Sequence, residues 1–267
     1  MASKYLDVDK FHAEYMFTKK AGHASQIAFE AVKNDTDIVV AVGGDGTINE
    51  IASVLESTGT TMGIIPYGSG NGLARSLGIP MNDKQALLKL NNLNVNAIDS
   101  GTINGRKFFN MAGIGFDAHV SIRFADDVTR GLSGYVRTAM TEISKYSYLH
   151  YHLEIDGKTY DCDAFMISIA NSSQFGNNAH IAPFASLSDG LLDICIIKPF
   201  PLYQFPVMGY RMFSKSTHKS KYVEIIKAKE IRILREKPDA VHLDGEPMIM
   251  DSELKIGIKP LSLFVLN

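Results

Sequence analysis

The stretch that decides the fold is residues 39–50, Val39-Val40-Ala41-Val42-Gly43-Gly44-Asp45-Gly46-Thr47-Ile48-Asn49-Glu50. An apolar run leads into a glycine-rich turn, and Ile48, Ile51 and Leu55 then recur at helical spacing. A strand that feeds a tight turn into a helix points unpaired backbone N–H groups at one place, which suits a phosphate. The Asp45 carboxylate would repel a polyphosphate unless a cation lay between them, so the turn predicts a site for a metal-bound nucleotide. A simple β-turn is the alternative, but alternating residues would then follow it.

Composition describes an ordinary globular protein. The 267 residues suggest one large or two modest domains, and 45% hydrophobic residues are ample for a core. The formal charge of −2 gives no general attraction for nucleic acid, so none is expected as a partner. No apolar run approaches a membrane span and the first residues lack the apolar core of a secretion signal, so we expect a cytoplasmic protein. Cys162 and Cys195 lie in apolar runs without metal-ligand spacing and are predicted to be buried free thiols.

A second unit of the same kind follows the first. Residues 62–66 read as a strand, residues 67–72 as a glycine turn and residues 73–78 as the start of a helix. Two successive strand, glycine turn and helix units predict a doubly wound α/β layer in which both turns lie at the same carboxyl edge. Ligands bind at that edge.

From about residue 98 the pattern changes to strands joined by hairpins, with turns at Asn104-Gly105 and Asp156-Gly157. We therefore predict an α/β protein with a nucleotide-binding domain over residues 1–97 and a mostly antiparallel β-sandwich domain over residues 98–267. Further strands are expected over residues 191–197, 222–226, 231–234, 241–243 and 261–266, and helices over residues 135–144 and 203–213, with Pro206 in the first turn of the second helix.

Five blocks in this order resemble the bacterial diacylglycerol kinase-like lipid kinase family, which is related to sphingosine kinases and NAD kinases. The blocks are residues 43–50 (GGDGTINE), 66–75 (PYGSGNGLAR), 113–117 (GIGFD), 188–193 (SDGLLD) and 243–247 (LDGEP). The resemblance implies a nucleotide domain followed by a β-sandwich that carries lipid-site residues. It also implies ATP and Mg²⁺ as cofactors.

The resemblance assigns roles to three groups of residues. Nucleotide contacts fall on Thr18, Gly22, His23, Gly43, Gly44, Asp45, Gly46, Thr47, Ile48, Asn49, Gly68, Ser69 and Asn71. The catalytic group is Asp45, Asp244 and Glu246. Asp45 either binds the metal ion or is a positioning residue, and Asp244 and Glu246 jointly accept or orient the proton of the lipid hydroxyl. Ser186, Asp189 and Leu191 form a second, structural magnesium site. The alternatives are that residues 22–23 only begin a helix, and that the Asp-Gly pairs at 189 and 244 only form turns.

The chain departs from the family pattern at its start. Members open with a strand and an Asn-Pro-type loop, whereas we expect this sequence to begin with the second strand, predicted over residues 11–17. Near Asp189, relatives often have more acidic residues where this chain has Ser186 and Ser188. Lysines and arginines crowd residues 211–237 after an aromatic and methionine-rich segment, which predicts contact with an anionic membrane, although a solvated charged face is an equal alternative.

These features predict a kinase that transfers the γ-phosphate of ATP to a hydroxyl of a diacylglycerol-like lipid. It would act as a peripheral protein at the inner face of the membrane. The rivals are a kinase for a soluble substrate, as in NAD kinases, and a nucleotide-binding module without turnover. The sequence leaves a homodimer open.

Overall fold

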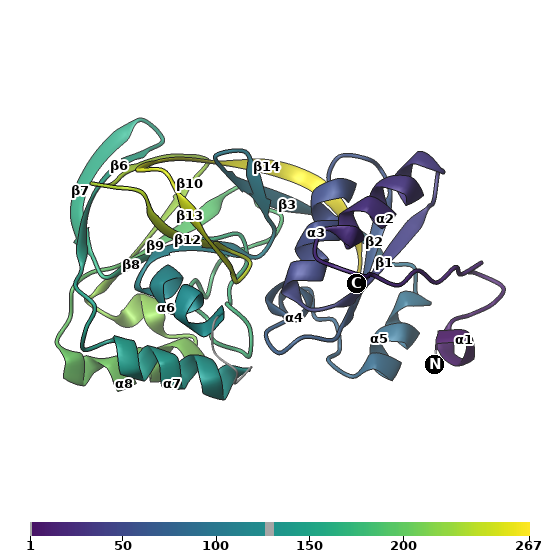
Figure 1. Cartoon of the computed structure of the whole chain (residues 1–267), viewed down its shortest axis with the longest axis horizontal. Helices are drawn as coiled ribbons and strands as arrows, with labels where there is room; N and C mark the ends of the chain where they lie inside the picture. The colour runs from purple at the N-terminus through teal and green to yellow at the C-terminus, as the bar shows by residue number, and fades with distance from the viewer. Residues whose placement is uncertain (1, 126–130) are drawn as a thin grey trace.

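The structure is a computed structural model that describes residues 2–125 and 131–267, and it has two lobes side by side (Figure 1). The N-terminal lobe contains α1 (Ala2–Tyr5), α2 (His23–Lys33), β1 (Ile38–Gly43), α3 (Asp45–Leu55), β2 (Thr61–Pro66), α4 (Gly72–Ser76) and α5 (Asp83–Leu90). The C-terminal lobe contains β4 (Arg106–Phe108), β5 (Met111–Gly115), α6 (Phe116–Ala125), α7 (Leu132–Glu142), β6 (Leu149–Ile155), β7 (Lys158–Ala164), β8 (Met166–Ala170), β9 (Leu192–Ile197), η1 (Leu202–Gln204), α8 (Phe205–Phe213), η2 (Thr217–Lys219), β10 (Val223–Ala228), β11 (Glu230–Leu234), β12 (Asp239–Leu243) and β13 (Glu246–Met250). Two long strands, β3 (Val95–Ile103) and β14 (Glu253–Leu266), run between the lobes.

The two predicted strand, turn and helix units are confirmed. β1 and β2 are parallel and in register from Ile38 opposite Thr61 to Gly43 opposite Pro66, so both strands end at the same edge. α3 follows β1 directly and buries Ile48, Ile51, Ala52 and Leu55 against the sheet, as its helical spacing predicted. The two glycine turns therefore lie together at the carboxyl edge.

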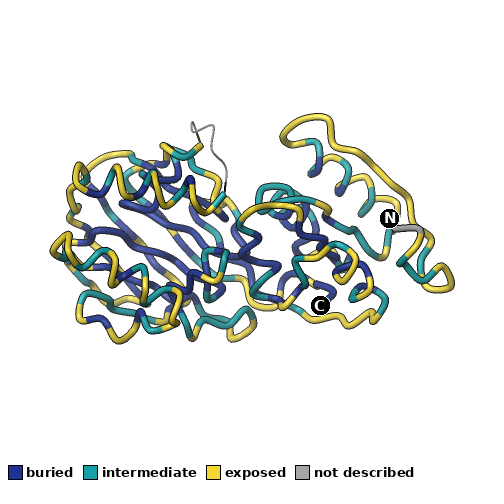
Figure 2. Tube along the Cα trace, turned by 90° about the horizontal axis from the view of Figure 1, so that it is seen from below, coloured by how far each residue is buried: buried dark blue, intermediate teal, exposed yellow. Residues whose placement is uncertain are grey.

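The strand predicted over residues 11–17 is wrong. These residues have no regular structure and all but Phe11 are exposed, in a long excursion that Figure 2 shows along the outside of the lobe. A strand needs a neighbour to satisfy its backbone groups. In the described part of the chain β1 ends its sheet and pairs with β2, and no strand lies beside residues 11–17. The apolar and aromatic side chains of residues 12–17 therefore do not form the buried face of a strand.

The C-terminal lobe is a sandwich of two mostly antiparallel sheets, as predicted. One sheet has the order β10-β9-β8-β5-β12-β13, and the other continues from the N-terminal lobe as β1-β2-β14-β11-β6-β7. Both predicted hairpin turns form, with Asn104 and Asp156 at positive φ. The core between the sheets is built around fully buried side chains such as Phe108, Tyr151 and Ile167.

β14 is longer than the strand predicted over residues 261–266, because a register shift between Lys259 and Leu263 lets it leave the sandwich and continue beside β2. The sheet is thus continuous across the two lobes. Residue 98, the predicted start of the second domain, lies inside β3, and that boundary stays a prediction.

The smaller predictions have mixed outcomes. The two predicted helices correspond to α7 and α8, and Pro206 lies in the first turn of α8. Both cysteines are free thiols, but only Cys195 is fully buried, whereas Cys162 is partly exposed. None of the described helices is long and apolar enough to cross a bilayer.

Candidate functional site

The two glycine turns touch each other. The Tyr67 N–H at the end of β2 donates to the carbonyl of Gly43 at 2.8 Å. A Cβ on Gly68 would lie 2.6 Å from the Gly44 Cα, closer than real Cβ contacts, so only glycine allows this approach. The turns therefore form one surface of backbone at the edge of the sheet.

Asp45 ties the first turn to the second. It is the first residue of α3, and its Oδ2 and Oδ1 accept the backbone N–H groups of Asn71 and Gly72, both at 2.9 Å. Burial raises the pKa of Asp45, while the two N–H donors act in the opposite direction. Because both carboxylate oxygens already hold the backbone of the second turn, the geometry favours the positioning role among the two predicted for Asp45.

Asn71 shapes the second turn from inside. Its side chain donates to the Gly68 carbonyl at 2.7 Å and accepts the Gly68 N–H at 3.1 Å, and the residue is buried at positive φ. Its amide is therefore engaged within the turn. Ser69, in contrast, is exposed.

The predicted contacts at residues 18–23 lie beside α3. Gly22 precedes α2 at positive φ and donates its N–H to Glu50 at 2.8 Å, which joins α2 to α3. The His23 Nδ1 accepts the Lys19 N–H at 3.0 Å, so that ring nitrogen closes the local turn. Thr18 is exposed. The nucleotide roles of Thr18, Gly22 and His23 stay predictions.

Asp244 is a buried anchor between the lobes. Its carboxylate accepts four N–H groups, from the Asn49 side chain at 2.7 Å and from the backbone of Phe109, Asn110 and Met111 at 2.9–3.0 Å. Burial raises the pKa of Asp244, and the four donors oppose that shift because they favour the ionised form. The two oxygens have about four lone-pair sites in total, and all are taken.

Glu246 has a different environment, although it is only two residues away. It begins β13 and is exposed, and a Cβ placed on Gly46 would lie 2.8 Å from its Oε1. Its carboxylate thus lies against the first turn of α3, where the helix dipole attracts negative charge. The two carboxylates predicted to handle the acceptor proton are therefore distinct: Asp244 is fully bonded, and Glu246 is accessible at the glycine turns.

Comparison with known proteins fits this arrangement. The family model of the diacylglycerol kinase catalytic domain matches residues 2–103, and that of the YegS C-terminal NAD kinase beta sandwich-like domain matches residues 110–267, more than half of the chain. The chain belongs to the diacylglycerol kinase-like lipid kinase family. It is 29% identical over 237 residues to a diacylglycerol kinase of Bacillus subtilis, covering 86% of this chain and 77% of that protein. It is 30% identical to a Pseudomonas aeruginosa protein named "Probable lipid kinase YegS-like", over 93% of this chain and 82% of that one.

The fold of this lipid kinase family member also has a solved counterpart. A crystal structure of a diacylglycerol kinase from Bacillus anthracis superposes with a TM-score of 0.74 at 23% identity, covering 94% of this chain and 83% of that one. At this identity the likeness concerns the fold alone.

A buried ion pair behind the LDGE turn was not predicted. The His242 Nε2 lies 2.5 Å from Asp117 Oδ2, and the Tyr135 hydroxyl donates to Asp117 Oδ1 at 2.5 Å. Burial disfavours the charged form of both partners. The charge of each partner and the hydrogen bond between them outweigh that effect, so the pKa of Asp117 is lowered and the pKa of His242 is raised from its ordinary value. The GIGFD block contained Asp117, but nothing in the sequence linked it to a histidine 125 residues later.

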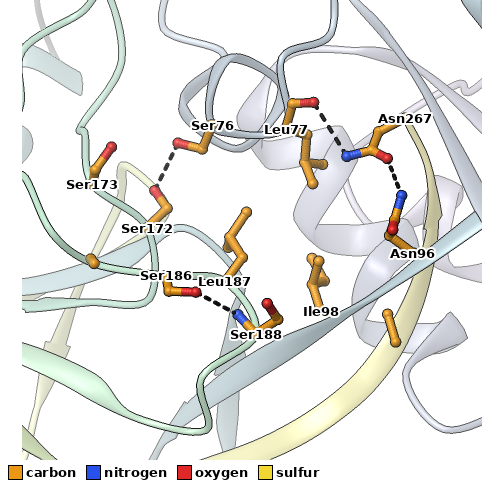
Figure 3. A pocket seen from close by; sticks show the side chains of 12 residues that line it. Ser76, Leu77, Asn96, Ile98, Ser172, Ser173, Ser186, Leu187, Ser188 and Asn267 are labelled. Atoms are coloured by element: carbon orange, nitrogen blue, oxygen red, sulfur yellow. Dashed lines mark hydrogen bonds between the residues drawn. The ribbon is translucent and has the colours of Figure 1, made fainter.

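The residues predicted for a structural magnesium lie in the loop before β9. Ser186 lines a pocket between the lobes with Ser76, Asn96, Ser172 and Asn267, and its hydroxyl accepts the Ser188 N–H (Figure 3). Asp189 does not line that pocket. Its Oδ1 accepts the Leu191 N–H at 3.1 Å, and its Oδ2 pairs with the Lys227 ammonium at 2.7 Å.

Lys227 also lies 3.1 Å from the buried Asp193 carboxylate, so one ammonium pairs with both acids. The magnesium role of Ser186, Asp189 and Leu191 stays a prediction.

Proposed function

We propose that the protein is an ATP- and magnesium-dependent lipid kinase that phosphorylates a hydroxyl of a diacylglycerol-like lipid at a membrane surface. The observation that carries the proposal is the position of Glu246. It is an exposed carboxylate that lies against Gly46, in the turn expected to hold the nucleotide phosphates. An acceptor hydroxyl and a γ-phosphate can meet there.

The glycine turns supply the phosphate side of the reaction. Backbone N–H groups of residues 44–47 at the start of α3, with Ser69 opposite, would stabilise negative charge on the phosphates. Magnesium, which arrives with ATP, would neutralise charge on the β- and γ-phosphates. Asp45 holds the two turns together, so its contribution is to keep the N–H groups in place.

Glu246 supplies the acceptor side. A carboxylate of ordinary basicity does not deprotonate an alcohol ahead of reaction, but it orients the hydroxyl and takes its proton late in a loose transition state. Asp244 acts indirectly, because its four hydrogen bonds fix the turn that carries Glu246 against α3 and β5. We therefore assign Glu246 to the acceptor and Asp244 to positioning.

The surface of η1 and α8 supports a membrane as the place of reaction. Met208 is buried, whereas the large apolar and aromatic side chains of Leu202, Tyr203, Tyr210 and Phe213 are all more than half exposed. Exposed lysines at 215 and 219 follow directly. Exposed aromatic side chains next to basic ones suit the interface of an anionic bilayer.

The test is a substrate panel with labelled ATP and Mg²⁺. Vesicles that contain diacylglycerol, monoacylglycerol or a sphingoid base are compared with NAD in solution. Label that enters diacylglycerol and increases with the anionic lipid content of the vesicles is expected. Label in NAD and in no lipid would replace the proposal with the soluble-substrate kinase, and no transfer to any acceptor despite ATP binding would favour a nucleotide-binding module.

A further inference from the structure

Two histidines and two aspartates gather on the outer face of the hairpin formed by β6 and β7, far from the glycine turns. His150 lies opposite Asp163 and His152 opposite Asp161 in the antiparallel register. Residues two apart on a strand point to the same face, so all four side chains share one surface. Each of them is half exposed, with 50–58% of its side chain accessible.

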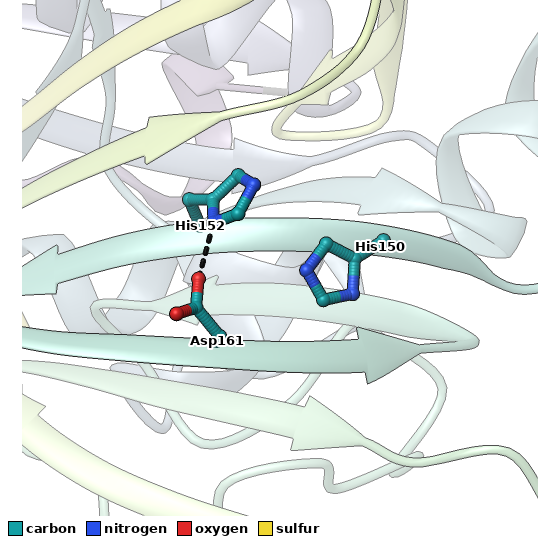
Figure 4. Close-up of side chains that lie close together, drawn as sticks. All are labelled: His150, His152 and Asp161. Atoms are coloured by element: carbon teal, nitrogen blue, oxygen red, sulfur yellow. Dashed lines mark hydrogen bonds and ion pairs between the residues drawn. The ribbon is translucent and has the colours of Figure 1, made fainter.

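The ligand atoms of three of these residues converge. One nitrogen or oxygen atom from each of His150, His152 and Asp161 lies within 4.8 Å of the other two. The His150 Nδ1 is held by Asp163 Oδ1 at 2.8 Å, and Figure 4 shows the other ring nitrogen of His150 directed toward His152 and Asp161. The His152 Nδ1 and the Asp161 carboxylate are hydrogen-bonded to each other.

We propose that His150, His152 and Asp161 bind a divalent transition-metal ion of the Zn²⁺ type, with Asp163 as a positioning residue. Zinc takes imidazole nitrogen and carboxylate oxygen at about 2.0–2.2 Å, so an ion between these groups needs only small side-chain rotations. Water fills the fourth position because the face is open to solvent. Two imidazoles select zinc and its neighbours over Mg²⁺ and Ca²⁺, which prefer oxygen.

The proton balance of binding follows from the hydrogen bonds. When the ion takes the place of the hydrogen between the His152 Nδ1 and the ionised Asp161 carboxylate, the neutral ring carries its proton on Nε2, so binding changes the tautomer of His152 and releases no net proton. Asp163 keeps its bond to the His150 Nδ1–H, which presents the other nitrogen to the ion. A carboxylate behind a metal-binding imidazole typically fixes the ring in this way.

The fold itself does not require these four residues. The inward side chains of β6, Tyr151, Leu153 and Ile155, form the core contacts, and exposed ion pairs contribute only about 0–1 kcal/mol each. β7 ends the sheet, so charges that discourage strand pairing are the alternative use of its aspartates. That alternative does not explain the two histidines, nor the ring nitrogen of His150 that is directed toward His152 and Asp161.

The experiment titrates Zn²⁺ into metal-free full-length protein by calorimetry, with excess Mg²⁺ present, and records the visible absorption of a Co²⁺-loaded sample. One equivalent is expected per chain. The double variant His150→Ala/His152→Ala and the single variant Asp161→Asn lose it, and Asp163→Ala weakens affinity about 10- to 100-fold. Glu154→Gln is the matched control, because it removes a charge from the same face of β6 and should bind like the parent.

His12→Ala, an exposed histidine elsewhere, should also bind normally. A double variant that binds Zn²⁺ as tightly as the parent would overturn the site. Asp161→Asn repeats the test on a single side chain if the double variant is unstable. Kinase activity is not a readout, so this result stands apart from the proposed function.

Discussion

The Asn49 side chain donates to the Asp244 carboxylate at 2.7 Å and so joins the second turn of α3 to the LDGE turn of the other lobe. The same amide also reaches the Lys107 carbonyl at 3.2 Å. The glycine turn and Glu246 belong to different lobes, and this contact fixes one against the other. Asn49, which we predicted to contact the nucleotide, thus connects the two halves of the site.

Replacement of Asn49 by Ala should therefore affect both stability and catalysis. It removes one donor from a buried carboxylate, which should lower the free energy of unfolding by about 1.5–3 kcal/mol. It also loosens the placement of Glu246, which should reduce kcat by up to about 100-fold. Urea unfolding and steady-state kinetics measure the two effects. Ser53→Ala is the control, since its hydroxyl bonds Asn49 at 3.3 Å without touching Asp244. A kcat equal to the parent's would contradict the linking role.

Local patterns in the sequence identified the elements of the site, but not their partners. The spacing of Ile48, Ile51 and Leu55 identified α3, and the glycines around Asp45 and Gly68 located both turns. The roles of Asp45 and Asp244 depend on contacts with residues 26 and 195 positions away along the chain, and no periodicity encodes such contacts. For the same reason the sequence could not separate Asp244 from Glu246, since burial is set by the other lobe.

Separate substitutions should distinguish these two carboxylates. Glu246→Gln keeps the size and an exposed position, so stability and ATP affinity should hold while kcat falls by about 10²- to 10⁴-fold, the usual contribution of a general base. Asp244→Asn turns an amide N–H toward backbone N–H donors, so it should reduce both stability and activity. Calorimetry of ATP binding, thermal melts and initial rates give the three readouts. Parent-level turnover by Glu246→Gln would remove it from the acceptor site.

The His242–Asp117 pair predicts how stability varies with pH. The folded pKa of His242 lies above its ordinary value, so its contribution is fully present below about pH 6.5 and is lost as the pH rises through the folded value. Asp117 has the opposite sign: its pKa is lowered, so its contribution is present above about pH 4 and is lost in more acidic solution. Unfolding free energies between pH 5 and 9 should therefore fall on the alkaline side.

His242→Gln should flatten that alkaline decline, because it removes the titrating ring while Tyr135 still bonds Asp117. His12→Gln, at an exposed position, should keep the parent's slope. An identical pH profile in His242→Gln and the parent would show that the pair carries none of the dependence.

Lys227 should stabilise the loop of residues 186–193 by charge. Its ammonium lies 2.7 Å from Asp189 and 3.1 Å from Asp193, and Asp193 is only 2% exposed. Lys227→Met keeps the length of the side chain but leaves a buried acid without a cation, which should lower the free energy of unfolding by about 1–3 kcal/mol. The same variant should also change how stability varies with pH. Burial already raises the pKa of Asp193, and without Lys227 this pKa should rise further. Because Asp193 then holds its proton more tightly in the folded state than in the unfolded chain, the variant should lose stability as the pH rises above about 4. It should differ least from the parent below that pH.

Lys198→Met is the matched control for this loop, because it breaks the exposed pair with Glu224 on the neighbouring strand and should change stability by no more than about 1 kcal/mol. Denaturant unfolding at pH 4 and pH 7 measures all three proteins. A Lys227→Met variant that is as stable as the Lys198→Met variant at pH 7 would mean that Asp193 does not need the ammonium.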